Sequence, residues 1–99
     1  MTPAAVELHP EAQAEARAAT AWYRERSEAA ADGFVAELDD AVREISEFPD
    51  RWPQYTPSTR RYLFRRYPYY VVYRQISAII QILAVAHAHR RPGYWRGRA

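Results

Sequence analysis

Residues 60–87 read RRYLFRRYPYYVVYRQISAIIQILAVAH. Two short breaks, Tyr67-Pro68 and Ser77-Ala78, divide them into three stretches at 60–66, 69–75 and 79–87. Aromatic and β-branched residues bounded by turn residues are typical of β-strands. Connections this short join strands that run antiparallel. The segment therefore predicts a three-stranded antiparallel meander.

The residues before the meander predict two helices. Pro10 followed by Glu11 marks a helix start, because proline fits the first turn and a carboxylate favours the positive end of the helix dipole. Residues 10–27 contain no internal breaker, and Ser27 is a typical N-cap for a second helix. Residues 28–48 carry an apolar stripe with helical spacing. The stripe is formed by Phe34, Leu38, Ala41, Ile45 and Phe48. Two helices joined so closely predict an antiparallel hairpin.

Three shorter features complete the predicted fold. Residues 4–8 are apolar enough to form a strand, and residues 49–58, with three prolines, predict a loop. Gly33 interrupts the second helix at a cost of about 1 kcal/mol against alanine, so we expect it to permit close packing on the first helix. The predicted order is β-α-α-β-β-β, an α+β fold with the helix hairpin on one face of a twisted sheet. We expect residues 1–99 to form one domain.

Composition restricts the kind of protein. The 99 residues contain no cysteine, which excludes disulfides and thiolate metal sites. No apolar run approaches the roughly 20 residues of a membrane span, and the first residues lack the order of a secretory signal. We therefore expect a cytoplasmic protein that needs no metal or other cofactor and does not enter a membrane.

The charges are divided between the two halves of the chain. Residues 1–50 hold all twelve carboxylates and four arginines, a balance of −8. Residues 51–99 hold ten arginines and no acid, a balance of +10, and the chain has no lysine. Such asymmetry indicates an anionic partner for the second half. The alternative is internal neutralisation, with an acidic layer packed beside a basic layer.

The alternation of side chains in residues 60–66 bears on whether the arginines face a partner or the acidic helices. Arg61 and Arg65 fall on one face of the predicted strand, while Tyr62 and Phe64 fall on the other and are candidates for the core. We therefore expect Arg61 and Arg65 to point away from the helices, where a partner can reach them.

Five stretches of the sequence carry a resemblance to a known family. They are ELHPEAQAE (7–15), AWYRERS (21–27), FVAELDDAVREISEFPDRWP (34–53), RRYLFRRYPYYVVYR (60–74) and ILAVAHAHRRPGYW (82–95). In this order and spacing the chain resembles, over nearly its full length, the RelE/ParE superfamily of toxins from type II toxin–antitoxin modules, and it is more ParE-like than RelE-like. The resemblance implies a cytoplasmic bacterial toxin that a labile antitoxin wraps. RelE-like members cut messenger RNA in the ribosomal A site, whereas ParE-like members poison DNA gyrase through protein contacts.

The RelE-like alternative has its own candidate residues. Metal-free RNA cleavage needs a base, cations that stabilise the phosphorane, and an acid. If the chain is a ribonuclease, the residues expected to supply them are Arg61, Arg65, Arg74, His87 and Tyr94. The absence of lysine, and of any carboxylate after Asp50, departs from the RelE pattern. Whether the chain is an enzyme stays open at this point.

For partner or nucleic-acid binding, the expected residues are Arg61, Arg65, Arg74, His89, Arg90, Arg91 and Arg96. His87 and His89 are two apart on a predicted strand and should face the same way, as a proton-transfer pair, a metal pair or a structural hydrogen bond. Trp95 is expected to plug the edge of the core, while Tyr94 either packs there or stacks on a base.

Three functions follow from these observations. The first is a toxin that acts by protein contact on gyrase and forms a hetero-oligomer with an acidic antitoxin. The second is a toxin that cleaves messenger RNA on the ribosome. The third is a nontoxic relic that only binds its partner.

Overall fold

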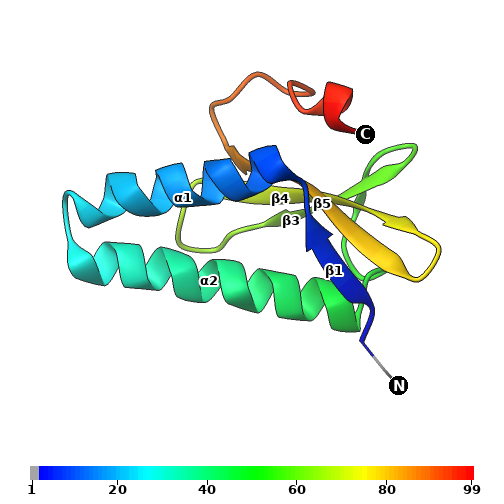
Figure 1. Ribbon diagram of the computed structural model, residues 1–99, viewed down its shortest axis with the longest axis horizontal. Coiled ribbons are helices and arrows are strands. Elements are labelled where there is room, and N and C mark those ends of the chain that lie inside the picture. The colour runs from blue at the N-terminus through cyan, green and yellow to red at the C-terminus, as the bar shows by residue number, and fades with distance from the viewer. Residues whose placement is uncertain (1–2) are drawn as a thin grey trace.

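The computed structural model describes residues 3–99, and two long helices lie on one face of a twisted sheet (Figure 1). The elements are β1 (Ala5–Leu8), α1 (Pro10–Arg24), α2 (Glu28–Glu47), β2 (Gln54–Thr56), β3 (Thr59–Leu63), β4 (Tyr69–Ile76), β5 (Ile79–His87) and the 3-10 turn η1 (Arg96–Arg98). The α+β class and the helix hairpin are confirmed.

The predicted antiparallel meander is present as β3, β4 and β5 and the predicted N-terminal strand as β1, but the sheet has five strands because β2 adds one that was not predicted. Its order is β1-β5-β4-β3-β2, with β1 parallel to β5 and every other pair antiparallel. β2 lies inside the predicted loop 49–58, and its three residues form an edge strand between Pro53 and Pro57, where missing amide donors are tolerated. β3 ends at Leu63, so Arg65 is not on a strand as predicted.

Side-chain caps set the ends of the two helices. His9 precedes α1, and its Nδ1 accepts a hydrogen bond from the Glu11 amide at 3.1 Å. Ser27 caps α2 by accepting from the Ala30 amide, also at 3.1 Å. Ser27 needs an extended backbone for this role, with φ −165°, so α1 stops at Arg24 rather than reaching residue 27. The predicted cap at Ser27 is confirmed.

The main core fills the space between the hairpin and the sheet. Phe34 and Ile45 of α2 are fully buried against Tyr73, Ile80 and Ile82 of the central strands. The predicted inward side chains of β3 and the residue after it are confirmed, because Tyr62 and Phe64 are 5% and 8% exposed. Phe48, the last residue of the predicted stripe, is instead half exposed because it lies at the C-cap of α2.

Gly33 makes room for Tyr67, not for α1 as the sequence suggested. A Cβ at Gly33 would collide with the Tyr67 hydroxyl, which donates a hydrogen bond to the Ala30 carbonyl at 2.7 Å. Tyr67 comes from the connection between β3 and β4 and stacks edge-on against Tyr23 and Phe34. A glycine in mid-helix therefore holds the β3–β4 connection against both helices.

Replacing this glycine tests the contact. Gly33→Ala raises helix propensity, yet we expect it to lower the free energy of unfolding by roughly 1–3 kcal/mol, because the methyl group displaces Tyr67. The double variant Gly33→Ala/Tyr67→Phe removes the colliding oxygen and should recover much of the loss. Urea unfolding of the two variants and of Tyr67→Phe alone measures the effect. A Gly33→Ala variant as stable as the parent would show that the contact does not constrain residue 33.

Buried tyrosines couple stability to alkaline pH. Burial, together with a hydrogen bond from Tyr62 to Glu44, raises the pKa of Tyr62 from 10.0 to about 12. Burial is the main cause that raises the pKa of Tyr73 to about 12; the charge of Arg60 opposes this shift and that of Asp50 adds to it, and the Tyr73 hydroxyl donates to the Pro49 carbonyl at 2.6 Å. Both folded-state pKa values lie above the unfolded value. Their stabilising contribution is therefore complete below pH 10 and is lost as the pH rises from about 10 towards 12.

We therefore expect the free energy of unfolding to fall in this range by up to about 1.4 kcal/mol per pH unit for each tyrosine. Urea unfolding between about pH 8 and 11.5, with tyrosinate absorbance followed in parallel, measures the slope. Tyr73→Phe should make the slope shallower. An unchanged slope in that variant would contradict the assignment.

Candidate functional site

The sheet face opposite the helices, called here the open face, carries a second small core. Tyr70 and Val72 of β4 pack there with Leu83 and Ala84 of β5, and Trp95 covers them. The remaining buried member is Ala86, and Tyr55 and Tyr94 pack around the edge. The open face is thus not bare: the end of the chain folds back over part of it, above β5 in Figure 1.

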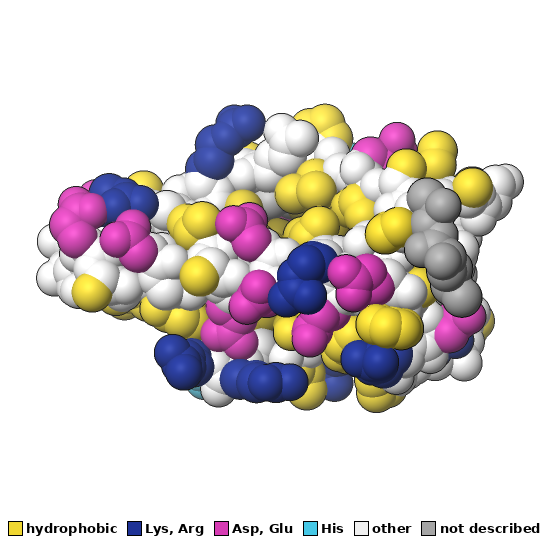
Figure 2. Space-filling view, turned by 90° about the horizontal axis from the view of Figure 1, so that it is seen from below, with side chains coloured by type: hydrophobic (Ala, Val, Ile, Leu, Met, Phe, Trp, Pro, Cys, Tyr) yellow, Lys and Arg dark blue, Asp and Glu magenta, His cyan; other side chains and the backbone are white. Residues whose placement is uncertain are grey.

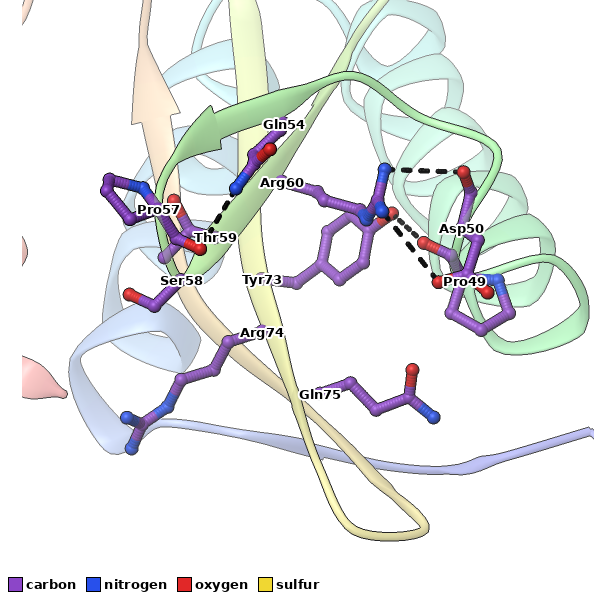
Figure 3. Close-up of a pocket in the computed structure, with 10 residues that line it drawn as sticks. All are labelled: Pro49, Asp50, Gln54, Pro57, Ser58, Thr59, Arg60, Tyr73, Arg74 and Gln75. Atoms are coloured by element: carbon purple, nitrogen blue, oxygen red, sulfur yellow. Dashed lines mark hydrogen bonds and ion pairs between the residues drawn. The ribbon is translucent and has the colours of Figure 1, made fainter.

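Arg61 and Arg74 lie on the uncovered part of the open face. The Arg61 guanidinium lies over the Tyr55 ring at 4.3 Å and near the Tyr70 ring at 5.2 Å, which confirms that it points away from the helices. Arg74 donates from Nε to Gln81 at 2.8 Å across the β4–β5 pair. Arg74 also lines the hollow drawn in Figure 3, where Arg60 donates to the carbonyls of residues 50 and 52, but its guanidinium points away from that of Arg60.

Arg65 lies elsewhere, contrary to the prediction. Because β3 ends at Leu63, the chain turns back to α2, and Arg65 lines a hollow with Glu37, Asp40 and Glu44. The amides of Arg65 and Arg66 both donate to the Glu37 carboxylate, which fastens this connection to the helix. Figure 2 shows the face seen from below Figure 1, where arginine and carboxylate side chains are interspersed.

Most arginines of residues 51–99 form no ion pair with a carboxylate of the described residues. Of the ten arginines in residues 51–99, only Arg60 and Arg98 lie within 4.0 Å of a carboxylate belonging to residues 3–99. The other eight are Arg51, Arg61, Arg65, Arg66, Arg74, Arg90, Arg91 and Arg96. Direct pairing with the helical acids therefore does not account for the positive charge.

One carboxylate that the sequence patterns do not single out, Glu15, fastens the C-terminal segment. Glu15 of α1 accepts hydrogen bonds from Arg98 on both oxygens at 2.9 Å, and from the Tyr94 hydroxyl at 2.7 Å. It also accepts the Val85 amide of β5 at 3.0 Å, and Arg98 donates to the Leu83 carbonyl at 3.0 Å. Among twelve acids, the only sequence signal for Glu15 is its place in an otherwise small, alanine-rich stretch.

The contacts of Glu15 fix the positions of the two aromatic residues near the C-terminus, Tyr94 and Trp95. Trp95 is 2% exposed, which confirms the predicted plug, and its indole nitrogen has no hydrogen-bond partner among residues 3–99. Burial first, and then the hydrogen bond to Glu15, raises the pKa of Tyr94 well above its usual range. Tyr94 is therefore a packing residue whose hydroxyl is already engaged.

A β-bulge determines where the two histidines lie. Val72 pairs with Ala84 but Tyr73 pairs with Ile82, so Leu83 is an extra residue in β5. The bulge reverses the alternation that follows it, and His87 faces the helix side, 5.0 Å from the Tyr69 ring. His89 lies in the turn after β5, not on the strand as predicted, yet its amide donates to His87 Nδ1 at 3.0 Å and the rings are 5.2 Å apart.

The five proposed ribonuclease residues do not converge. Arg61 and Arg74 are on the open face, Arg65 is beside α2, and His87 is on the helix side of the sheet. His87 and Tyr94 do meet, with Arg90, around a pocket of about 540 Å³ between α1 and the end of β5.

Within the described part of the chain, no three histidine, aspartate or glutamate residues group as metal ligands do. None of the described helices combines the length and apolarity of a membrane span.

Comparison with known proteins places this fold. In solved structures, the chain is similar to the chromosomal ParDE toxin–antitoxin system of P. aeruginosa, with a TM-score of 0.75 and 19% identity over 87% of this chain and 97% of that one. It is also similar to a double arginine-to-alanine mutant of E. coli toxin RelE in the free state, with a TM-score of 0.64 and 16% identity over 99% and 95% of the two chains. At these identities the likeness shows the fold.

No curated protein sequence matches the chain. The sequence model that describes the ParE toxin of the type II toxin–antitoxin system parDE matches residues 6–92. Since this match covers far more than half of the 99 residues, the chain belongs to the ParE toxin family.

Proposed function

We propose that this chain is the cytoplasmic toxin of a toxin–antitoxin pair, that it acts by protein contact on DNA gyrase, and that an acidic antitoxin neutralises it in a hetero-oligomer. Membership of the ParE toxin family supports the toxin role. The proposal of an acidic antitoxin rests on the arginines on and around the open face that have no carboxylate partner among residues 3–99. Arg61 and Arg74 have no carboxylate within 4.0 Å among residues 3–99.

The open face also offers apolar surface beside these charges. Leu63, Ile76 and Ile79 are between 39% and 58% exposed, near Arg61 and Arg74 on β3, β4 and β5. A basic and apolar surface of this kind is complementary to an acidic amphipathic segment. Such a segment would cross the sheet and reach the helix hairpin. The further contacts we assign to it are His89, Arg90, Arg91 and Arg96, all exposed after β5, with Arg65 at the margin because acids surround it.

A ribonuclease is the second candidate, and the pocket shared by His87, Arg90 and Tyr94 favours it. Two observations weigh against it. A tyrosine that serves as general base needs a lowered pKa, whereas the pKa of Tyr94 is raised and its hydroxyl donates to Glu15. The cations that would stabilise the phosphorane, Arg61 and Arg74, lie on the other face of the sheet. A nontoxic, antitoxin-binding relic is the third candidate.

Charge reversal tests the antitoxin surface. We expect Arg61→Glu/Arg74→Glu to slow association with the acidic protein encoded beside this gene by about tenfold or more at low salt, because steering depends on the sign of the surface charge. Raising salt from about 0.05 to 0.5 M should slow the parent chain and narrow the difference. Stopped-flow mixing measures both rates.

The matched control is Arg17→Glu, an equal charge change per site on the exposed side of α1. It should leave the rate nearly unchanged. If Arg17→Glu slows association per charge as much as the open-face variants, or if salt has no effect, net charge rather than the open face governs the encounter.

The target is tested by separating the two toxin activities. Purified chain should inhibit supercoiling by DNA gyrase, and its expression should produce DNA breaks without new messenger RNA ends. His87→Ala should leave gyrase inhibition intact, because this model of action uses no proton transfer. RNA cleavage at codon boundaries that disappears in His87→Ala would instead establish the ribonuclease. Absence of both activities, with antitoxin binding retained, would identify the relic.

A further inference from the structure

The pocket between α1 and the end of β5 is mostly walled by apolar and aromatic side chains. Its volume is about 540 Å³, within the range of sites that bury a ligand of several rings. Ala18 and Trp22 of α1 line it, together with Tyr69 of β4 and Val85 of β5. Trp22 is 51% exposed at the rim. An apolar recess that remains this open on a small domain is a site where another molecule can bury surface.

The polar groups free to act in the pocket are donors. His87 Nδ1 accepts the His89 amide, so the proton of the neutral ring lies on Nε2, where it can be donated. Arg90 lies over the Tyr94 ring at 4.1 Å and has no carboxylate within 4.0 Å among the described residues. Both groups therefore suit an anionic or acceptor atom on whatever occupies the recess.

The pocket's own carboxylate cannot neutralise these donors. Glu15 Oε1 accepts from the Val85 amide and from Arg98, and Oε2 accepts from the Tyr94 hydroxyl and from Arg98. Four donors occupy the lone pairs of one carboxylate. Arg98 also offsets the charge of Glu15, so among the described residues that line the recess Arg90 is left with its positive charge unpaired, which favours an anionic occupant.

We propose that this pocket receives an aromatic side chain of the antitoxin, and that a carboxylate next to that side chain binds Arg90 and His87 Nε2. This inference rests on the proposed function and specifies one anchor point within it. The aromatic ring matches the rings of Trp22 and Tyr69, which favour edge-to-face or offset contacts. A peptide anchor is favoured over a free small molecule because the pocket opens beside exposed Arg90 and Arg91, so the same acidic segment continues onto the basic surface.

Filling the recess tests the anchor. Ala18 is exposed on α1, so Ala18→Trp should occupy the pocket without disturbing the core. We expect it to weaken antitoxin binding at least tenfold, roughly the loss of one buried anchor. Ala14→Trp is the control: the same exchange on an exposed position of the same helix that does not line the pocket. It should keep the affinity within about twofold. Circular dichroism melts show that each variant is folded, and calorimetric titration gives the affinities.

The charge partner is tested with Arg90→Ala and with Arg66→Ala as its control, since both residues are exposed arginines without an ion pair in the described chain. Arg90→Ala should weaken binding about tenfold or more, and Arg66→Ala should have little effect. Overlapping peptides of the antitoxin locate the segment that binds. Changing its acidic residue to the amide should weaken binding to the parent chain but add little to Arg90→Ala, because the two changes remove one contact.

The possible failures differ in what they overturn. If Arg61→Glu/Arg74→Glu impairs antitoxin binding but Ala18→Trp does not, the proposed function stands and the anchor is wrong. If the parent chain does not bind the antitoxin, both are wrong. If 2-naphthoate or a short RNA binds the parent and not Ala18→Trp, while antitoxin affinity is unchanged in that variant, the pocket belongs to that other ligand and the anchor is overturned.

Discussion

The hydrogen bonds around Glu15 hold together the part of the fold on which the surfaces depend. β1 pairs with residues 79–82 of β5 and the chain then turns into α1, so within residues 3–99 the same edge of β5 has no neighbouring strand beyond residue 82. Glu15 accepts the Val85 amide at this edge, and Arg98 donates to the Leu83 carbonyl. A buried charge costs free energy unless it is paired and hydrogen-bonded. Arg98 donates to the Glu15 carboxylate and to the Leu83 carbonyl, while Glu15 accepts from Arg98 and from the Val85 amide. The ion pair therefore also satisfies the free backbone groups at this edge of β5.

This interaction also determines which face of the sheet is available. Arg98 and Tyr94 fix the C-terminal segment to α1, and Trp95 between them is thereby placed on the open face. The segment covers the apolar residues next to β5 and leaves the β3 side, with Arg61 and Leu63, uncovered. The indole N–H of Trp95 has no hydrogen-bond partner among residues 3–99, which costs free energy that the contacts around Glu15 must offset. The shape of the basic surface is therefore a consequence of one carboxylate on α1.

Much of the fold could be predicted from local patterns, while most of the site could not. Helical spacing from Phe34 to Ile45 and the cap at Ser27 are local signals, and the structure agrees with them. β2 was missed because three residues between prolines carry no alternation. Arg65 was misplaced because alternation in 60–66 does not reveal that β3 ends at Leu63. The position of a candidate site residue such as Arg65 depends on where its strand ends. Long-range contacts decide that point, such as the hydrogen bond from the Arg65 amide to Glu37.

The β-bulge at Leu83 is a second irregularity that local sequence patterns do not reveal, and it decides where the candidate catalytic residue His87 lies. Ile80 and Ile82 face the helices, so regular alternation would place residue 87 on the open face together with Arg61 and Arg74. One extra residue reverses this order and turns His87 towards Tyr69 and α1. A single β5 residue thus separates the histidine from the arginines with which it would have to share a phosphate. The arrangement leaves two distinct surfaces, a basic sheet face and an apolar pocket with donors at its rim. Two surfaces of this kind suit recognition of an extended acidic protein segment better than proton transfer at one point.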